Sequence, residues 1–183
     1  KRKICFVCIS MRGGGTERIV SRLANYFSDD FDVHIVIVHD SESFYPLAPS
    51  ITLHRQQRGS ERSKILRAVS MLRHISATVR MIKPAVILSF GELISPIARM
   101  ATIGSGARFV SFNRESPVRS IRGLAGIVNP LIYPLADLVV TQTEHAKRLL
   151  QPRYRFTRFG VIPNPIEIPY EVEGIRKRPK IVI

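Results

Sequence analysis

Three consecutive glycines, Gly13, Gly14 and Gly15, form the segment of this sequence best suited to close contact with a ligand. They separate an apolar run from a helical pattern, so they occupy a strand-to-helix turn. Glycine lets the backbone approach a ligand closely, and the N-terminus of the following helix offers free N–H groups to an anion. Thr16 is the expected N-cap of that helix. A tight turn without a ligand explains the triplet equally well.

Polar side chains also follow the other predicted strands, at the ends where open α/β sheets bind their ligands. Arg114 is the natural contact for an anionic group. Each of these residues, taken alone, is more often a helix cap or a solvated loop residue, and Thr143 fits capping well. Together with the glycine turn and Thr16, the predicted substrate-binding residues are Glu92, Asn113, Arg114, Glu115, Thr143 and Asn164.

Other chemistries find little support in the sequence. No Gly-Lys-Ser/Thr follows the glycines, which excludes a P-loop, and their spacing disfavours a dinucleotide fingerprint. No Ser-His-Asp set, metal cluster or nucleophile elbow stands out, and His34, His39 and His54 fall at predicted strand ends. Cys5 and Cys8 are three apart on a predicted strand and so point to opposite faces, which disfavours a disulfide. We expect two buried thiols in a reducing compartment and no metal.

Alternating strand and helix patterns provide the elements that position these residues. Apolar runs predict strands at 3–10, 33–38, 51–54, 85–90, 107–112, 138–141 and 160–162. The runs are continuous rather than alternating, which is typical of strands covered on both faces. Helical spacing covers 17–27, a long segment that stops at Pro84, and a segment through about Ala101. The pattern predicts an α/β domain with a Rossmann-like, doubly wound parallel sheet.

The chain is strongly basic, and its charge is unevenly distributed. It has 183 residues, with 28 Lys and Arg against 14 Asp and Glu and a net charge of +14. Residues 54–83 hold eight Lys or Arg against one Glu, which is half of that net charge. Because these cations lie on an amphipathic helix, we expect contact with an anionic membrane surface; a solvated face is the alternative. The predicted membrane-contact residues are Lys64, Arg67, Arg73, Arg80 and Lys83.

The apolar positions of this long helix, Ile65, Val69, Leu72 and Ile75, are predicted to form one buried stripe. The nearly uncharged stretch 123–140 contains two prolines and an aspartate, so a membrane-spanning helix is not expected there. A stand-alone module for nucleic acid or another polyanion is the other class that suits a basic surface. Against it, stacking aromatics are not interleaved with the basic run and no nucleic-acid motif is present.

The first domain is predicted to span residues 1–166, ending at the Pro163-Asn164-Pro165 segment. Residues 167–183 are polar and charged, and then turn apolar at the end. We interpret them as a linker and the first strand of a second domain that lies beyond this sequence.

Five segments, in this order, resemble the N-terminal domain of retaining GT-B glycosyltransferases of family four, over about residues 3–183. Bacterial enzymes that build lipid-linked glycans and surface polysaccharides are the most similar members. The chain lacks the His that many members carry near the strand ends at Phe90 and Phe112. Asn113 stands where one branch of the family has the Glu of a Ser-Glu-Arg-x-x-Pro-like motif, so catalytic roles are not carried over. The segments are Gly13 to Arg18, Lys83 to Phe90, Asn113 to Pro117, Ala136 to Thr143 and Val161 to Ile166.

The resemblance implies that this half binds the acceptor, a glycan that is often lipid-linked. It implies a hexosyl or N-acetylhexosaminyl transfer with retention, in bacterial polysaccharide or glycoconjugate synthesis. The glycine turn would face the cleft, and Arg114 and Glu115 would contact acceptor or sugar. The donor, a nucleotide-diphosphate sugar, would bind to a C-terminal domain of the same chain, so this half needs no cofactor and is inactive alone. The expected location is cytoplasmic, at the inner face of the membrane, without nucleic acid as a partner.

Overall fold

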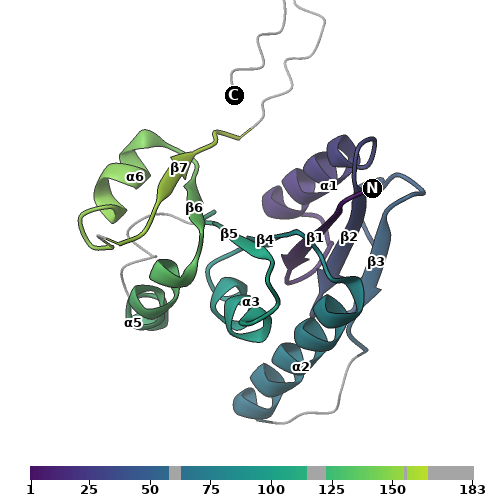
Figure 1. Ribbon diagram of the computed structural model, residues 1–183, viewed down its shortest axis with the longest axis horizontal. Helices are drawn as coiled ribbons and strands as arrows, with labels where there is room; N and C mark the ends of the chain where they lie inside the picture. The colour runs from purple at the N-terminus through teal and green to yellow at the C-terminus, as the bar shows by residue number, and fades with distance from the viewer. Residues whose placement is uncertain (58–62, 115–122, 155, 165–183) are drawn as a thin grey trace, which may run out of the picture.

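The computed structural model describes residues 1–57, 63–114, 123–154 and 156–164, and shows one sheet with helices on both faces (Figure 1). The strands are β1 (Lys3–Cys8), β2 (Asp32–Ile37), β3 (Thr52–Arg55), β4 (Val86–Phe90), β5 (Arg108–Phe112), β6 (Leu138–Thr141) and β7 (Phe159–Val161). The helices are α1 (Gly15–Phe27), α2 (Lys64–Ile82), α3 (Ile94–Thr102), α5 (Gly123–Ile132) and α6 (Glu144–Leu150), with a 3-10 turn, η1 (Tyr133–Leu135).

All seven strands pair in parallel, in the order β3-β2-β1-β4-β5-β6-β7. The chain starts in the middle of the sheet at β1, builds outward to β3, and then crosses back to β4 and continues to β7. The order reverses between β1 and β4, which is the point where doubly wound sheets bind ligands. The predicted α/β class and sheet are confirmed, with strand boundaries shifted by one or two residues.

Two separate apolar cores lie on the two faces of the sheet. Helix α1 covers one face, and α2, α3 and α5 lie on the other (Figure 1). Successive residues of β1 alternate between the cores, so Cys5 belongs to the α2–α3 core and Cys8 to the α1 core. Both thiols are free and buried, as the strand pattern predicted. Burial raises the pKa of the Cys5 thiol to about 12, so it is not a thiolate at neutral pH.

Three phenylalanines of neighbouring strands stack in the α1 core. The Phe90 ring lies 5.8 Å from that of Phe6 and 4.4 Å from that of Phe112, and the rings of both pairs are nearly parallel. Buried aromatic pairs of this kind contribute about 0.5–1.5 kcal/mol each beyond the burial of their area. The stack joins β1, β4 and β5 directly below the loops that follow these strands, so it fixes the base of the candidate site.

The predicted buried stripe of α2 is wrong in its first half. Ile65 is 75% exposed and Val69 is 41% exposed, whereas Leu72 is partly buried and Ile75 is fully buried. The buried side chains of α2 begin only at Ile75, because its first turns extend beyond α3 and the sheet (Figure 1). The helical period was predicted correctly, but the first turns of the helix bury few of their side chains against the rest of the described structure.

Several local predictions also need correction. The N-cap of α1 is Gly14, not Thr16, which lies inside the helix. Helix α5 forms in the uncharged stretch with Pro130 inside it, and the sequence analysis did not predict this helix. His34 and His54 lie within β2 and β3 rather than at strand ends. None of the helices in the described ranges is long and apolar enough to cross a membrane.

Candidate functional site

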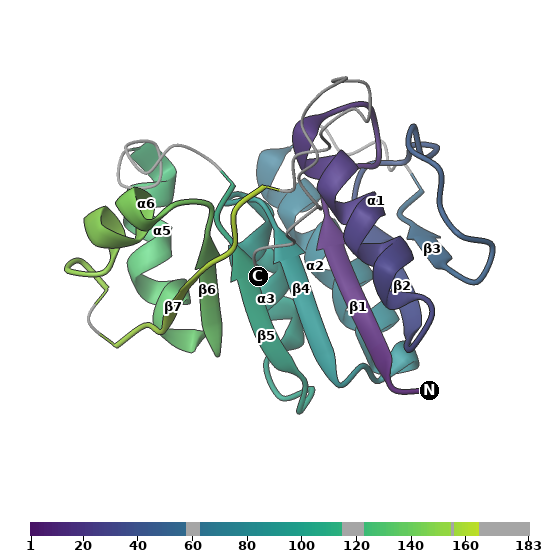
Figure 2. The same ribbon diagram turned by 90° about the horizontal axis from the view of Figure 1, so that it is seen from above.

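The loops that follow the strands all leave the parallel sheet at one edge, which is uppermost in Figure 2. The glycine turn follows β1, Glu92 follows β4, Asn113 and Arg114 follow β5, and Thr143 and Asn164 follow β6 and β7. The structure therefore places the predicted site residues on one rim, as parallel pairing requires. Glu115 lies outside the described residues.

Backbone conformation does not require the glycines of the turn, and lack of space requires only Gly14. None of the three has a positive φ. A Cβ built on Gly13 would lie 3.4 Å from the Phe44 ring, and a Cβ on Gly14 would overlap the Oε2 atom of Glu17. A Cβ on Gly15 would have no neighbour within 4 Å, so this residue presents bare backbone to open space.

The turn already carries a negative charge of its own. The Glu17 carboxylate lies against Gly14 at the start of α1, and its Oε1 atom accepts a hydrogen bond from the Ser10 hydroxyl at 3.3 Å. Burial, followed by the charge of Glu17, raises the pKa of the Cys8 thiol. A carboxylate near the first turn of a helix is favourable for the helix dipole but unfavourable for a bound anion. The glycine turn therefore suits neutral groups such as hydroxyls better than phosphates.

A hollow of about 510 Å³ opens beside this turn. Both serines that line it are held by backbone groups: the Ser41 hydroxyl accepts from the Met11 N–H at 3.0 Å, and the Ser43 hydroxyl donates to the Tyr45 carbonyl at 2.7 Å. The wall combines one aromatic ring with several polar groups, which can hold the apolar and polar parts of a small ligand. Its lining residues are Arg12, Gly13, Ser41, Glu42, Ser43 and Phe44.

Asn113 and Glu92 are buried rather than open to the rim. Asn113 is 2% exposed, and its side-chain amide donates to the Tyr133 hydroxyl at 3.0 Å. Glu92 is 4% exposed and lies near Tyr154, whose pKa is raised by burial, lowered by Arg153 and raised further by the Glu92 charge. In this conformation the two residues are placed to position their neighbours, not to contact a ligand themselves.

Arg114 is partly buried at the end of β5. Burial lowers the pKa of its guanidinium, and its Nε atom is buried without a hydrogen-bond partner. Its backbone carbonyl accepts a hydrogen bond from the Gln142 side chain at 2.8 Å. The other end of the Gln142 amide accepts from the Asn164 side chain at 3.3 Å. Gln142 thus joins the ends of three strands, β5, β6 and β7.

Thr143 is confirmed as a helix cap, because its hydroxyl accepts from the Ala146 N–H at 3.1 Å at the start of α6. Gln142, Glu17 and Phe44 were not among the predicted binding residues, although Gln142 lies in a polar segment that was expected on the rim. Gln142 stands among polar residues after a predicted strand, and Glu17 belongs to the glycine segment, so local signals existed for both. Phe44 comes from a distant loop, and its place over Gly13 has no local signal.

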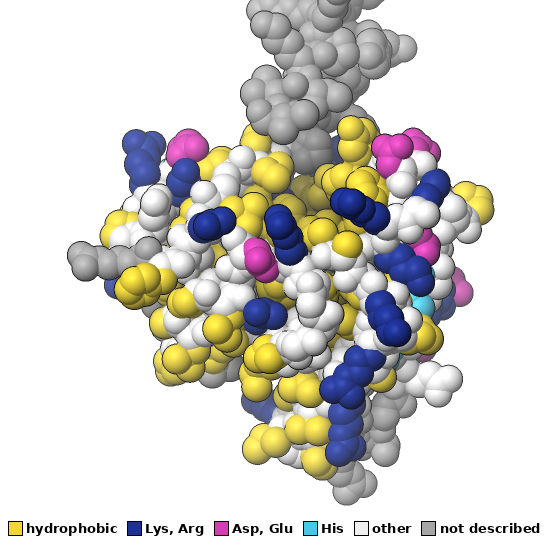
Figure 3. Space-filling view, viewed as in Figure 1, with side chains coloured by type: hydrophobic (Ala, Val, Ile, Leu, Met, Phe, Trp, Pro, Cys, Tyr) yellow, Lys and Arg dark blue, Asp and Glu magenta, His cyan; other side chains and the backbone are white. Residues whose placement is uncertain are grey.

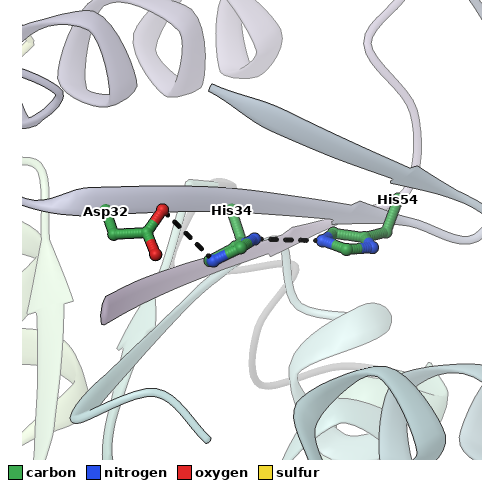
Figure 4. Close-up of polar contacts among 3 residues, drawn as sticks. All are labelled: Asp32, His34 and His54. Carbon is green, nitrogen blue, oxygen red and sulfur yellow. Dashed lines mark hydrogen bonds and ion pairs between the residues drawn. The ribbon is translucent and has the colours of Figure 1, made fainter. Parts of the chain in front are cut away.

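A metal centre finds no support, since the described parts of the chain contain no group of three or more His, Cys, Asp or Glu residues suited to a metal ion. Three polar side chains on β2 and β3, Asp32, His34 and His54, contact one another in a row (Figure 4). The Nδ1 atom of His34 lies 3.1 Å from the Nε2 atom of His54, and the Nε2 atom of His34 lies 3.4 Å from the Oδ1 atom of Asp32. Asp32 begins β2, so this group starts at the edge of the sheet opposite the candidate site.

Comparison with solved structures shows the same fold in glycosyltransferases. The sucrose-phosphate synthase of Thermosynechococcus elongatus aligns with a TM-score of 0.71 and 13% identity, over 89% of this chain and 48% of that chain. The lipopolysaccharide outer core galactosyltransferase WaaB, in its apo form, aligns with a TM-score of 0.67 and 16% identity, over 92% of this chain and 47% of that chain. Alr3699/HepE of Anabaena, in complex with UDP and glucose, aligns with a TM-score of 0.66 and 15% identity, over 91% of this chain and 45% of that chain. The chain spans about half the length of these structures, and the likeness confirms the Rossmann-like sheet of GT-B glycosyltransferases.

Comparison of the sequence itself with curated proteins gives no match. Residues 13–168, by contrast, match glycosyltransferase family 4. This range contains the glycine turn, the polar loops of the rim and β2 to β7. Because the match covers most of its length, the chain belongs to glycosyltransferase family 4.

Proposed function

We propose that this chain is the acceptor-side, N-terminal half of a retaining GT-B glycosyltransferase. The enzyme transfers a hexosyl or N-acetylhexosaminyl unit from a nucleotide-diphosphate sugar to a lipid-linked glycan, in bacterial polysaccharide or glycoconjugate synthesis. The observation that carries the proposal is the family 4 match over residues 13–168, which contains the whole polar rim. A related fold in complex with UDP and glucose supports a nucleotide sugar as the donor.

The rim supplies groups that position an acceptor rather than groups that attack a bond. Gly15 offers bare backbone to a ligand in the open space beside it, and the Glu17 carboxylate can accept a hydrogen bond from a sugar hydroxyl. Retaining transfer in this fold requires that the acceptor hydroxyl is oriented and the leaving diphosphate is stabilised. We assign no nucleophile to this half.

A transfer assay with the full-length protein tests this proposal. Uridine-diphosphate hexoses and N-acetylhexosamines are offered with membrane lipid extracts that contain glycan acceptors, and label in the lipid fraction is measured. We expect transfer from one donor, a product with the anomeric configuration of the donor, and no transfer by residues 1–166 alone. Hydrolysis or isomerisation of every donor without transfer would refute the transferase, and an inverted product would refute retention.

The domain organisation is part of the same proposal. Residues 1–166 form the acceptor-side domain, and residues 167–183 lead into a second domain that binds the nucleotide sugar. Limited proteolysis of the full-length protein is expected to cut within 167–183 and release a stable fragment of about residues 1–166. Cleavage elsewhere first, with no fragment of that size, would contradict this boundary.

The surface of α2 supports the further proposal that the enzyme works at the cytoplasmic face of an anionic membrane. Lys and Arg greatly outnumber Asp and Glu on the face shown in Figure 3. The five predicted cations of α2 and its C-cap are exposed, and Ile65 and Leu66 are 75% and 58% exposed beside them. Each cation near an anionic leaflet contributes about 1 kcal/mol, and exposed apolar side chains add burial at the lipid boundary. The exposure of Ile65 and Leu66 at the start of α2 therefore favours membrane contact.

Sedimentation with vesicles tests this surface. Binding is expected to require anionic lipid, to weaken as salt rises, and to fall when Arg67, Arg73 and Arg80 are all replaced by Gln. A matched control variant replaces three exposed cations that lie outside α2: Arg18 on α1, Arg148 on α6 and Arg153 just after α6. Equal binding to neutral and anionic vesicles, or equal losses in both variants, would refute an α2 contact.

A further inference from the structure

Arg114 is a charged side chain whose guanidinium has no protein partner in the described structure. Its Nε atom is buried without a hydrogen bond, and no Asp or Glu in the described ranges forms an ion pair with it. Burial lowers the pKa of this group, because the guanidinium has lost part of its contact with water. A charged donor left unpaired in this way costs free energy in the unliganded protein.

The backbone around Arg114 is held from several sides. The Asn113 N–H donates to the Val140 carbonyl at 2.8 Å, and the Asn113 side chain is fixed by the Tyr133 hydroxyl. Gln142 holds the Arg114 carbonyl at 2.8 Å. These contacts come from β6, from the residue that follows it and from η1, so the origin of the side chain is fixed from several elements of the fold. A charge placed so firmly without a partner is typical of a site that awaits an anion.

We infer that Arg114 is the anion-binding residue of the rim, that Gln142 positions it, and that the anion is a phosphate or diphosphate group. The inference rests on the proposed function, which offers two sources of this chemistry: the diphosphate of the nucleotide sugar and the diphosphate that links a glycan to its lipid. The glycine turn does not compete for the anion, because Glu17 places a carboxylate there. The two parts of the rim thus bind different parts of the substrates, hydroxyls at the turn and phosphate at Arg114.

Titration of the full-length protein with inorganic pyrophosphate tests the site without requiring turnover. Arg114→Gln is expected to weaken pyrophosphate binding about tenfold or more, and Arg114→Lys less, because it keeps the charge but not the fork of donors. The matched control is Arg148→Gln, on the exposed side of α6, which is expected to bind as the wild type does. Gln142→Ala is expected to weaken binding while leaving the guanidinium in place.

The thermal midpoint separates a binding role from a structural one. Without pyrophosphate, Arg114→Gln is expected to have a Tm equal to or above that of the wild type, since an unpaired charge is removed. Wild-type pyrophosphate affinity in Arg114→Gln, or an equal loss in Arg148→Gln, would overturn the inference. A lower Tm for Arg114→Gln would also overturn it, because the guanidinium would then stabilise the fold through internal contacts.

Steady-state kinetics distinguish the two sources of phosphate. If the acceptor supplies the group, Arg114→Gln raises the KM for the acceptor and leaves the KM for the nucleotide sugar unchanged; the reverse result identifies the donor. An unchanged KM for both substrates would overturn the inference even if transfer occurs. Pyrophosphate binding that depends on Arg114, in a protein that transfers no sugar, would refute the proposed function while leaving the anion site intact.

Discussion

Replacing Gly15 by Ala separates the two explanations of the glycine turn. The residue begins α1, its φ is not positive, and an added methyl group would have no neighbour within 4 Å. Ala at a helical position is favoured over Gly by about 0.5–1 kcal/mol. For a domain of this size that corresponds to a Tm increase of about 1–4 °C. The fold is therefore expected to become more stable.

The effect on activity is expected to be opposite. If substrate lies against the bare backbone of Gly15, the methyl group enters the space that the ligand occupies, at a cost of about 1–3 kcal/mol. That cost corresponds to a loss of kcat/KM of about 5- to 150-fold. Differential scanning calorimetry and initial rates on the same full-length preparation measure both quantities. A higher Tm with unchanged kcat/KM would refute ligand contact at Gly15 and leave the glycine run as a simple turn.

The neighbouring glycines supply matched controls. Gly14→Ala is expected to lower the Tm, because its methyl group overlaps the Glu17 carboxylate and displaces it from the Ser10 hydroxyl. Gly13→Ala brings its methyl group 3.4 Å from the Phe44 ring, a contact that a small shift of the ring relieves. A Tm loss in Gly15→Ala as large as that in Gly14→Ala would contradict the geometry of the turn.

Three further predictions concern stability. Burial, followed by the charges of neighbouring histidines, lowers the pKa of His54 below its usual 6.5, and burial also lowers the pKa of His74. Because the unfolded chain then binds more protons than the folded one, this contribution to stability is complete above about pH 6.5 and is lost as the pH falls below it. Urea unfolding between pH 5 and 8 measures the change. Ile75→Ala is expected to cost about 2–5 kcal/mol because Ile75 is fully buried, whereas Ile65→Ala, at a 75% exposed position, is expected to change the free energy of unfolding by no more than about 0.5 kcal/mol. Thr143→Ala removes the cap of α6 and is expected to lower stability by about 1 kcal/mol; an unchanged Tm would show that the cap is dispensable.

The sequence predicted the sheet well because buried parallel strands leave a strong local pattern. The run that ends at Phe90 is apolar except for Ser89, and β4 is covered on both faces. The opposite orientations of Cys5 and Cys8 followed from strand geometry alone and are confirmed. The stripe of α2 failed at Ile65 because periodicity shows which side of a helix is apolar, but not how far the neighbouring layer extends.

The candidate site was predictable only in outline. Parallel strands send their carboxyl ends to one edge, so the rim could be predicted, but its contacts could not. The bonds of Gln142 to Arg114 and Asn164 join residues far apart in the sequence, and no local pattern encodes them. The cap of α1 shows the same limit: a Thr after three glycines satisfies the local rule, yet the helix begins earlier, at Gly15.

The central position of β1 has a consequence for the kinetics of folding. Ile4 lies beside Val33 of β2 on one side and beside Val86 of β4 on the other, so the two pairings of the same strand close loops of very different length. The β1–α1–β2 unit can form early, whereas the face that α2 and α3 cover stays exposed until these later helices pack on it, and the longer closure, of β1 with β4, is the slower one. During synthesis the apolar face of β1 and β2 therefore passes through an interval in which it can bind other chains.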